Sequence, residues 1–152
     1  MFLEVFALSQ AVGVLLRDAM AGGPLTPEEY AVYSVVFEEE AVTPTEMGRR
    51  LGMPKTTVVE RVRVMEERGH VRRIAHPEDG RSYHLVLTAS GLAAFRRSHD
   101  LFEEAYRAFV RELAGDDARA QARLEQIRTA VTAASAKREA GHAGRPRRLV
   151  TR

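Results

Sequence analysis

Two segments of the chain begin with the same pattern of threonine, proline and glutamate, and this repetition constrains the fold most strongly. The segments are Thr26-Pro27-Glu28-Glu29 and Thr43-Pro44-Thr45-Glu46. Threonine caps the free N–H groups of a helix, proline suits its first position, and glutamate at its third position completes a capping box. The pattern predicts helices over residues 27–39 and 44–51, the second closed by Gly52.

A further helix and a hairpin follow directly along the chain. Met53-Pro54 starts a helix that we predict to reach Arg68, and Gly69 ends it. β-forming residues then predict strands over residues 71–76 and 81–87, around a turn at residues 77–80. A short helix, a tight turn, a second helix and a two-stranded hairpin together form a winged helix-turn-helix. In such a unit the second helix reads the major groove of DNA.

Longer helices are predicted on both sides of this unit. Residues 2–20 are apolar around much of a helix, which predicts burial against more than one partner. Two later helices carry apolar or aromatic residues at the spacing of helices that pack along one another. The first helix covers about 89–114, and its stripe consists of Leu92, Phe95, His99, Phe102, Tyr106, Phe109 and Leu113. The second helix starts at Asp117, and its stripe consists of Ala120, Leu124, Ile127, Val131 and Ala134. The first stripe fits an intersubunit contact or the core of one subunit.

The predicted fold is therefore mainly α with a small β-hairpin wing. We expect a winged helix-turn-helix lobe at about 25–88, flanked by N- and C-terminal dimerisation helices at 1–21 and 89–138. Residues 1–140 would form one domain. Residues 141–152, with glycine, proline and arginine, would form a disordered basic tail, whose arginines either bind DNA non-specifically or are simply solvated.

The excess of basic residues lies outside the predicted winged helix-turn-helix lobe. The sequence pI is about 9.3, but residues 137–152 alone carry a charge of +5. Because the whole chain carries only +2, residues 1–136 carry −3. A DNA-binding surface must therefore be a local patch, to be found from helix geometry and not from overall charge.

Helical geometry separates a buried from an exposed face in the second helix of the unit. At 100° per residue, Val58, Val62 and Met65 share the side that should pack on the domain. We expect Arg63 to contact guanine bidentately and Arg81 to enter the minor groove. The full set of expected DNA-binding residues is Thr43, Thr45, Lys55, Thr56, Thr57, Glu60, Arg63, Arg73, His76, Arg81 and Ser82.

A weaker pattern suggests a pocket for a small effector. Arg17, Tyr30, Tyr33 and His99 would line it between the DNA-binding lobe and the dimerisation helices, although core packing explains each equally well. His99 would act as a switch or, with more weight, as a structural histidine.

Several classes of protein are excluded. The chain has no cysteine, and its histidines show no metal-binding spacing, so we predict no disulfide, metal or cofactor. It lacks a P-loop and a nucleophile elbow, which argues against an enzyme. It also lacks a membrane-length apolar run and a basic signal region, so we expect a cytoplasmic protein with no membrane partner.

The order of four segments resembles the MarR (multiple antibiotic resistance regulator) family over residues 1 to about 138. The segments are residues 51–60, 65–73, 77–81 and 87–91. The resemblance implies a homodimer that binds a pseudo-palindromic double-stranded operator, as a repressor released by a small, often phenolic effector. Thr56 and Thr57 match the pair that opens the recognition helix, and Asp79 and Arg81 match the wing.

Three residues depart from the family pattern, and they leave an alternative function open. Gly80 replaces a common arginine, Glu60 stands where a basic residue is frequent, and His70 replaces a usual leucine. The acidic residues and the charge of −3 also fit a protein-interaction module that uses the same fold without reading DNA.

Overall fold

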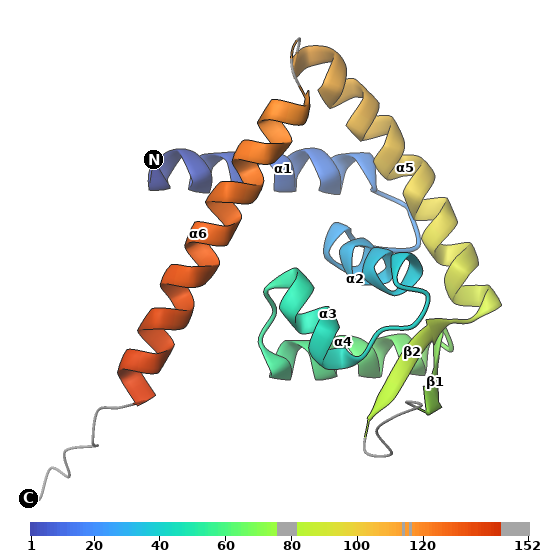
Figure 1. Cartoon of the computed structure of the whole chain (residues 1–152). Helices are drawn as coiled ribbons and strands as arrows, with labels where there is room; N and C mark the ends of the chain where they lie inside the picture. Colours follow the sequence, from blue (N-terminus) through green and yellow to red (C-terminus); the bar gives the residue numbers. More distant parts are fainter. Residues whose placement is uncertain (76–81, 114, 116, 144–152) are drawn as a thin grey trace, which may run out of the picture. The chain divides into compact units, whose positions relative to one another are not determined.

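The computed structural model describes residues 1–75, 82–113, 115 and 117–143, and it divides into two compact units, Met1–Arg111 and Glu112–Arg152 (Figure 1). The first unit contains five helices and the hairpin among its described residues. The elements are α1 Phe2–Ala19, α2 Pro27–Glu38, α3 Pro44–Leu51, α4 Lys55–Glu67, β1 Val71–Ala75, β2 Tyr83–Leu87, α5 Ala89–Leu113 and α6 Asp117–Ala143. This is the predicted mainly helical fold with a two-stranded wing.

Both predicted capping boxes are present. Thr26 Oγ1 accepts from the Glu29 N–H at 3.2 Å, and Glu29 Oε2 accepts from the Thr26 N–H at 3.0 Å. Thr43 and Glu46 make the same reciprocal bonds at 3.2 Å and 2.9 Å. These local bonds fix where α2 and α3 begin, because each satisfies a backbone donor that the helix itself leaves unpaired.

The wing is an antiparallel hairpin with one contact that the sequence did not predict. β1 pairs with β2 in a register that sets Val71 opposite Leu87 and Ala75 opposite Tyr83. β1 covers every described residue of its predicted range, whereas β2 begins at Tyr83, so that Ser82 lies outside the strand. Val42, in the loop between α2 and α3, forms a bridge with Leu85 on the other side of β2. The hairpin is thereby joined to the helix-turn-helix by backbone hydrogen bonds.

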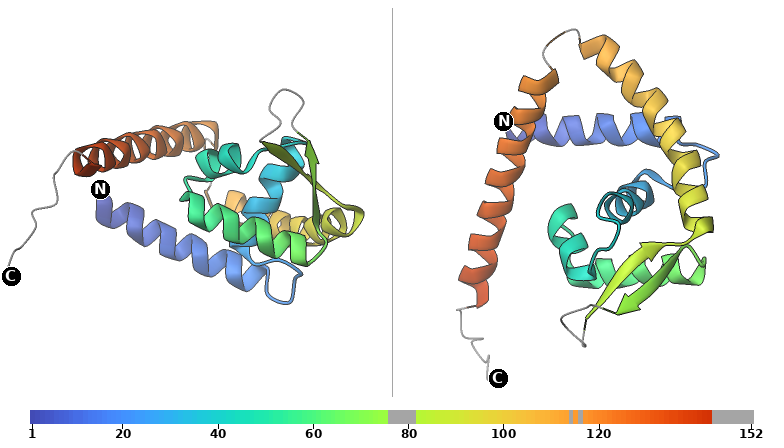
Figure 2. Two further views of the ribbon diagram at one scale, coloured as in Figure 1. Left: turned by 90° about the horizontal axis from the view of Figure 1, so that it is seen from below. Right: turned by 45° about the vertical axis from the view of Figure 1, so that its right-hand side comes forward.

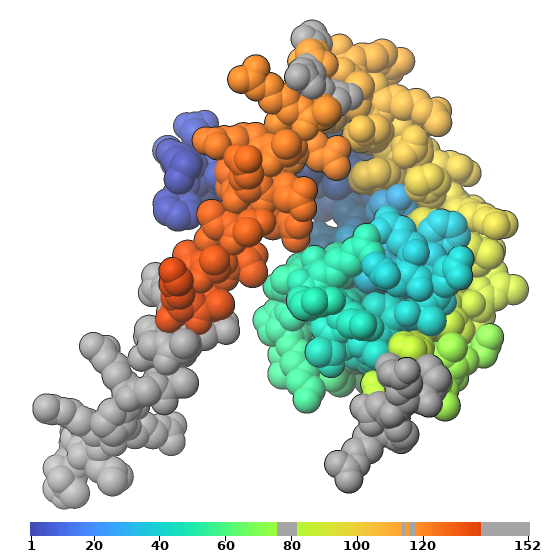
Figure 3. Space-filling model, viewed as in Figure 1, coloured from blue at the N-terminus to red at the C-terminus, as the bar shows by residue number. Residues whose placement is uncertain are grey.

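The core of the first unit lies where α2, α3, α4 and the hairpin meet. Val58, Val62 and Met65 are buried on the inner side of α4, which confirms the predicted face. Tyr33, Met47 and Leu85 are also almost fully buried. Figure 3 shows the side chains of α2 and α3, in cyan to green, packed into one continuous surface. Both views of Figure 2 place the hairpin beside α4, with which β1 is in contact.

The prediction that α1 is buried is wrong for the single chain. None of the described residues of α1 is buried, and the side chains of Phe2, Leu3 and Phe6 are 75%, 74% and 62% exposed. α1 contacts α2, and Met20, which directly follows α1, is buried in the core.

The stripe on α5 is divided between two environments. Phe95 is buried and Leu92 and Phe102 pack against the core, as a stripe within one subunit requires. Tyr106 and Phe109, further along the helix, are exposed. The first half of the stripe therefore belongs to the core of one subunit, whereas Tyr106 and Phe109 in the second half are exposed in the part of the chain that the structure describes.

The second unit contains the last turn of α5 and the helix α6. α6 continues to Ala143, beyond the predicted boundary at residue 140. The alanine-rich sequence before it has a high helix propensity, which favours this continuation. The predicted tail after residue 143 lies outside the described residues. No helix in the described part of the chain is long and apolar enough to cross a membrane.

Candidate nucleic-acid interface

A close backbone approach holds the turn between α3 and α4. Gly52 ends α3 with a φ of 65°, and the Met53 N–H donates to Gly48 O at 2.9 Å. A Cβ atom on Gly48 would lie 3.0 Å from Val58 Cγ2 and 3.2 Å from Met53 O. A larger residue at position 48 would therefore push α4 away, so this glycine fixes the direction in which the outer face of α4 points.

The first turn of α4 presents free backbone N–H groups beside exposed polar side chains. Pro54 is its N-cap residue, and within the described residues no side chain caps the helix. No acidic residue lies in this turn; Lys55 and Thr56 are exposed and Thr57 is half-buried. Unpaired N–H groups, the positive end of the helix dipole, an ammonium group and hydroxyls together suit a phosphate.

The two threonines expected to contact DNA from α3 differ in availability. Thr43 is 8% exposed, and its hydroxyl accepts from the Glu46 N–H and donates to Glu46 Oε2 at 2.8 Å. Its visible role is to cap α3, because the hydroxyl proton is already donated. Thr45 is exposed in the first turn of α3 and is free to face a ligand.

Arg63 is held by two glutamates of its own helix. Its Nε and Nη2 groups donate to the two carboxylate oxygens of Glu60 at 3.1 Å and 2.6 Å, and Nη1 donates to Glu67. Hydrogen bonding and charge attraction to Glu60 raise the pKa of Arg63, and Arg63 in turn lowers the pKa of Glu60. The outer face of α4 thus carries an ion-pair cluster, where the sequence suggested an unpaired arginine.

Arg73, predicted to face phosphate from the wing, is fixed by two neighbours. It forms an ion pair with Glu66 of α4, with an Nη2–Oε2 distance of 2.8 Å. Its guanidinium carbon also lies 4.2 Å from the centroid of the Tyr83 ring. Ser82 is half-buried at the start of β2, while His76 and Arg81, which we expected at the wing tip, lie outside the described residues.

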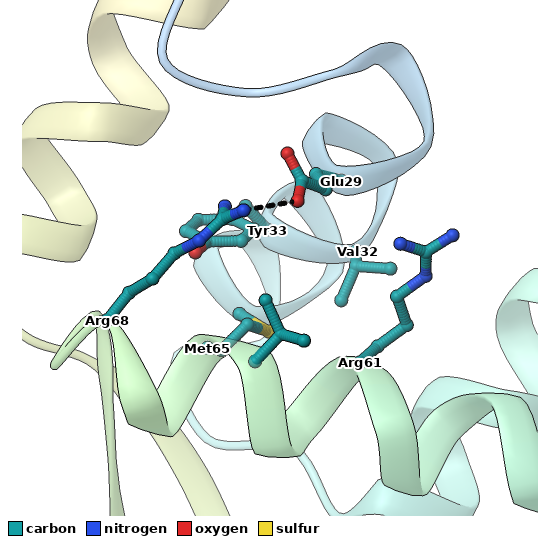
Figure 4. Close-up of a pocket in the computed structure, with 7 residues that line it drawn as sticks. Glu29, Val32, Tyr33, Arg61, Met65 and Arg68 are labelled. Carbon is teal, nitrogen blue, oxygen red and sulfur yellow. Dashed lines mark ion pairs between the residues drawn. The ribbon is translucent and has the colours of Figure 1, made fainter.

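Sequence analysis missed a chain of contacts between α2 and the end of α4. Arg68 Nη2 lies 2.9 Å from Glu29 Oε1 (Figure 4), and the Tyr33 hydroxyl lies 2.8 Å from His70 Nδ1. The crevice beside them, with Val32 and Met65 among its lining residues, leaves about 10 Å³, room for roughly one water molecule. Tyr33 and His70 are 37 residues apart, so no local pattern links them.

The expected effector residues separate into two places. The Tyr30 hydroxyl lies 2.7 Å from His99 Nδ1, and its ring stacks on Phe95 and Phe102. Burial raises the pKa of Tyr30. Tyr33 instead contacts His70, and Arg17 is exposed on α1. The structure therefore brings two of the four predicted residues together, with His99 half-buried and hydrogen-bonded in an aromatic cluster.

No group of three histidine, cysteine, aspartate or glutamate residues in the described part of the chain is arranged to hold a metal ion. The polar chemistry described above is that of phosphate, base-edge and aromatic contacts.

Comparison with known proteins identifies the winged helix-turn-helix. Residues 22–82 match the model of the MarR family. The chain is 34% identical over 87 residues to the HTH-type transcriptional regulator TtmR of Methylorubrum extorquens, covering 57% of this chain and 45% of that protein. The chain spans about half the length of the curated relatives it matches.

Two solved structures share the fold over most of the chain. The Mycobacterium tuberculosis regulator MOSR, solved in complex with DNA, superposes with a TM-score of 0.72 at 25% identity, covering 86% of this chain and 95% of that one. The PcaV regulator of Streptomyces coelicolor, solved with its natural ligand, superposes with a TM-score of 0.69 at 26% identity, covering 86% of this chain and 90% of that one. The winged helix-turn-helix of this chain is therefore similar to MarR-family regulators in sequence and in fold, which confirms the resemblance seen in the sequence.

Proposed function

We propose that the protein is a transcription regulator that binds double-stranded DNA as a homodimer. The observation that carries this proposal is the uncapped first turn of α4, where Lys55 and Thr56 are exposed and Thr56 lies on the side opposite the buried Val58. A recognition helix enters the major groove by its N-terminal end, where its free N–H groups meet phosphate. MOSR, which shares the fold, was solved bound to DNA.

The proposed contacts follow from the position of each residue. Lys55, Thr56 and Thr57 would contact phosphate and base edges, and Thr45 would contact phosphate from α3. Arg63 would read a guanine, with Glu60 beside it. The wing would add Arg73 and Ser82, together with His76 and Arg81, on the flanking phosphates and minor groove.

The exposed apolar side chains of α1 support the homodimer. A soluble monomer rarely leaves a helix with Phe2, Leu3 and Phe6 uncovered, and a second copy would supply the missing cover. A two-fold dimer presents two recognition helices related by symmetry, so its operator would be pseudo-palindromic. A dimer that occupies a promoter blocks polymerase, and we therefore propose that it acts as a repressor.

We propose that a small phenolic effector regulates the dimer near Tyr30 and His99. Their hydroxyl and imidazole groups, set among Phe95 and Phe102, offer polar contacts within an apolar aromatic cluster. PcaV, which shares the fold, was solved with its natural ligand. Calorimetric titration of the full chain with a panel of phenolic acids, repeated with Tyr30→Phe, tests this part of the proposal.

A mobility-shift titration tests DNA binding directly. The full chain is titrated at stated salt against the region upstream of its own gene and against a duplex selected from a random library. Specific binding should weaken steeply with salt, and Lys55→Ala should weaken it on all sequences alike. The control is Lys137→Ala, which makes the same charge change on α6. Absence of specific binding from both duplexes overturns the proposal.

A second function is favoured by one observation. Arg63 and Arg73 are neutralised by glutamates, which suits a module that holds a protein partner without reading DNA. Cellular repression that persists in a Thr56→Ala/Lys55→Ala double variant would favour this alternative.

A further inference from the structure

The joint between the recognition helix and the wing consists of three residues, Arg68, Gly69 and His70. Arg68 is the C-cap of α4, Gly69 has a φ of 65°, and β1 begins at Val71. The His70 N–H donates to Met65 O at 2.9 Å, so the chain turns directly from helix to strand. With so short a joint, any rotation at Gly69 or His70 changes the angle between α4 and the hairpin.

The start of α5 holds the backbone of the joint from one side. The hydroxyls of Thr88 and Ser90 donate to Gly69 O at 2.7 Å and 2.9 Å, and the Thr88 N–H donates to His70 O at 2.9 Å. A Cβ atom on Gly91 would lie only 2.0 Å from His70 O. α5 therefore packs against the carbonyl of His70 without any space between them.

Side chains of α2 hold the joint from the other side. Glu29 forms an ion pair with Arg68, and the hydroxyl of Tyr33, also on α2, contacts His70 Nδ1. Figure 4 shows Arg68 reaching from the end of α4 toward Glu29 and Tyr33 on α2. Tyr33 is 1% exposed, so this chain of contacts is sheltered from water at its centre.

The donors and acceptors in this chain of contacts require one protonation state of His70. The Tyr33 side chain is 1% exposed, so its hydroxyl is shielded from water. The buried Tyr33 proton then needs an acceptor, and His70 Nδ1 lies at hydrogen-bond distance. A neutral imidazole with its proton on Nε2 can accept the hydrogen bond from Tyr33, whereas an imidazolium at His70 would leave the Tyr33 proton without this acceptor.

We propose that Tyr33 and His70 are positioning residues that set the angle between the recognition helix and the wing, and that protonation of His70 releases this setting. The inference rests on the proposed DNA-binding function only for its effect on DNA. It assigns no direct DNA contact to either residue.

The charges around His70 determine the direction of the pH effect. From α2 it faces Tyr33 and Glu29, and from α4 it faces Arg68, while Thr88 and Ser90 at the start of α5 bring no titratable group. Burial, and then the charge of Arg68, lower the pKa of His70, with Glu29 opposing them. The folded joint therefore favours neutral His70. The angle between α4 and the hairpin is fixed above the ordinary pKa of 6.5 and is released as the pH falls through the lowered pKa of His70.

A DNA-free measurement tests the positioning role on the full chain. NMR residual dipolar couplings give the angle between α4 and the hairpin, and the His70 ring signals give its pKa. We expect the angle to change in wild type as His70 titrates and to differ at neutral pH in Tyr33→Phe. In His70→Asn it should stay fixed, because the asparagine Oδ1 can accept from Tyr33 and does not titrate. An angle that stays constant in wild type, or that changes equally in His70→Asn, overturns the proposal.

The effect on DNA is measured with the same variants. At pH 7.5, His70→Leu should bind roughly tenfold more weakly and lose hydroxyl-radical protection where the wing lies, because the acceptor for Tyr33 is gone. His70→Asn should restore this protection and remove the loss of protection that wild type shows on acidification. If His70→Leu leaves the hydroxyl-radical protection of the DNA under the wing unchanged, this result counts against the proposal. If wild type binds no duplex, the proposed function fails, and the angle measurement still decides the positioning role.

Discussion

Arg63 lies on the outer face of the recognition helix with a glutamate on each side. Its side chain is 54% exposed, so each pair is screened by water and contributes little to the stability of the fold. The pairs matter more for charge, because two carboxylates surround the arginine expected to meet a guanine. Glu60 both orients the guanidinium through a bidentate contact and repels nearby phosphate.

Removing one carboxylate should strengthen DNA binding and weaken discrimination. We expect Glu60→Gln to increase affinity for a random duplex roughly fivefold at about 0.1 M salt, because repulsion of phosphate falls. Affinity for the selected operator should rise less, since Arg63 loses its orienting partner. Fluorescence anisotropy on both duplexes measures the ratio. Glu125→Gln, which breaks an i,i+3 pair with Arg128 on α6, is the matched control and should change neither affinity.

Ser98 on α5 shows a different kind of residue-scale effect. Its hydroxyl is fully buried and finds no hydrogen-bond partner among the described residues. Removing an unsatisfied buried hydroxyl costs no bond, so Ser98→Ala should leave the free energy of unfolding unchanged or raise it by about 1 kcal/mol. Urea denaturation measures this. Ser34→Ala, which removes a hydroxyl bonded to Tyr30 O at 2.8 Å, should instead lower stability.

Helices α2 and α3 begin with capping boxes whose strength can be measured. Thr43→Ala should lower the free energy of unfolding by about 1 kcal/mol, because the first turn of α3 loses its cap. Thr45→Ala, an exposed neighbour in the same turn, should stay within about 0.5 kcal/mol of wild type. Equal effects of the two substitutions would contradict a capping role for Thr43.

The same capping box makes the stability of α3 depend on pH. Hydrogen bonds from the backbone and side chain of Thr43 lower the pKa of Glu46 below its ordinary value of 4.5. This contribution to stability is complete above about pH 4.5 and is lost as the pH falls through the lowered pKa. Urea denaturation between pH 3 and 6 should therefore show a smaller acid loss in Thr43→Ala than in wild type.

The elements that the sequence predicted are those set by local chemistry. Thr26 and Thr43 lie three residues from their capping partners, so a short sequence pattern predicts both helix starts. Val58, Val62 and Met65 follow the helical repeat, which predicts the buried face of α4. The contacts of Glu29 with Arg68 and of Tyr33 with His70 join distant segments through packing, which no such pattern reveals. The exposure of α1 was missed for a related reason, because the apolar sequence of that helix does not say which surface would cover it.

Across the whole molecule, uncovered apolar side chains gather on α1 and the later part of α5. If a second copy covers α1, a charge placed there should split the dimer. We expect Phe6→Glu to shift the full chain toward monomer in sedimentation velocity and to weaken operator binding in parallel. Ala11→Glu places the same charge on the other side of α1 and is the control for a general effect of charge. A monomeric wild type would contradict the dimer.

The bridge between Val42 and Leu85 makes β2 an inner strand at that point. The Leu85 amide donates to Val42 O at 2.8 Å, and both residues are buried. Opening the wing there requires separating it from the α2–α3 loop, so the hairpin cannot fray independently at its centre. Exchange of the Leu85 amide with deuterated solvent should therefore be as slow as global unfolding, while the amides of exposed α1 exchange much faster. The wing and the helix-turn-helix would then form one cooperative folding unit.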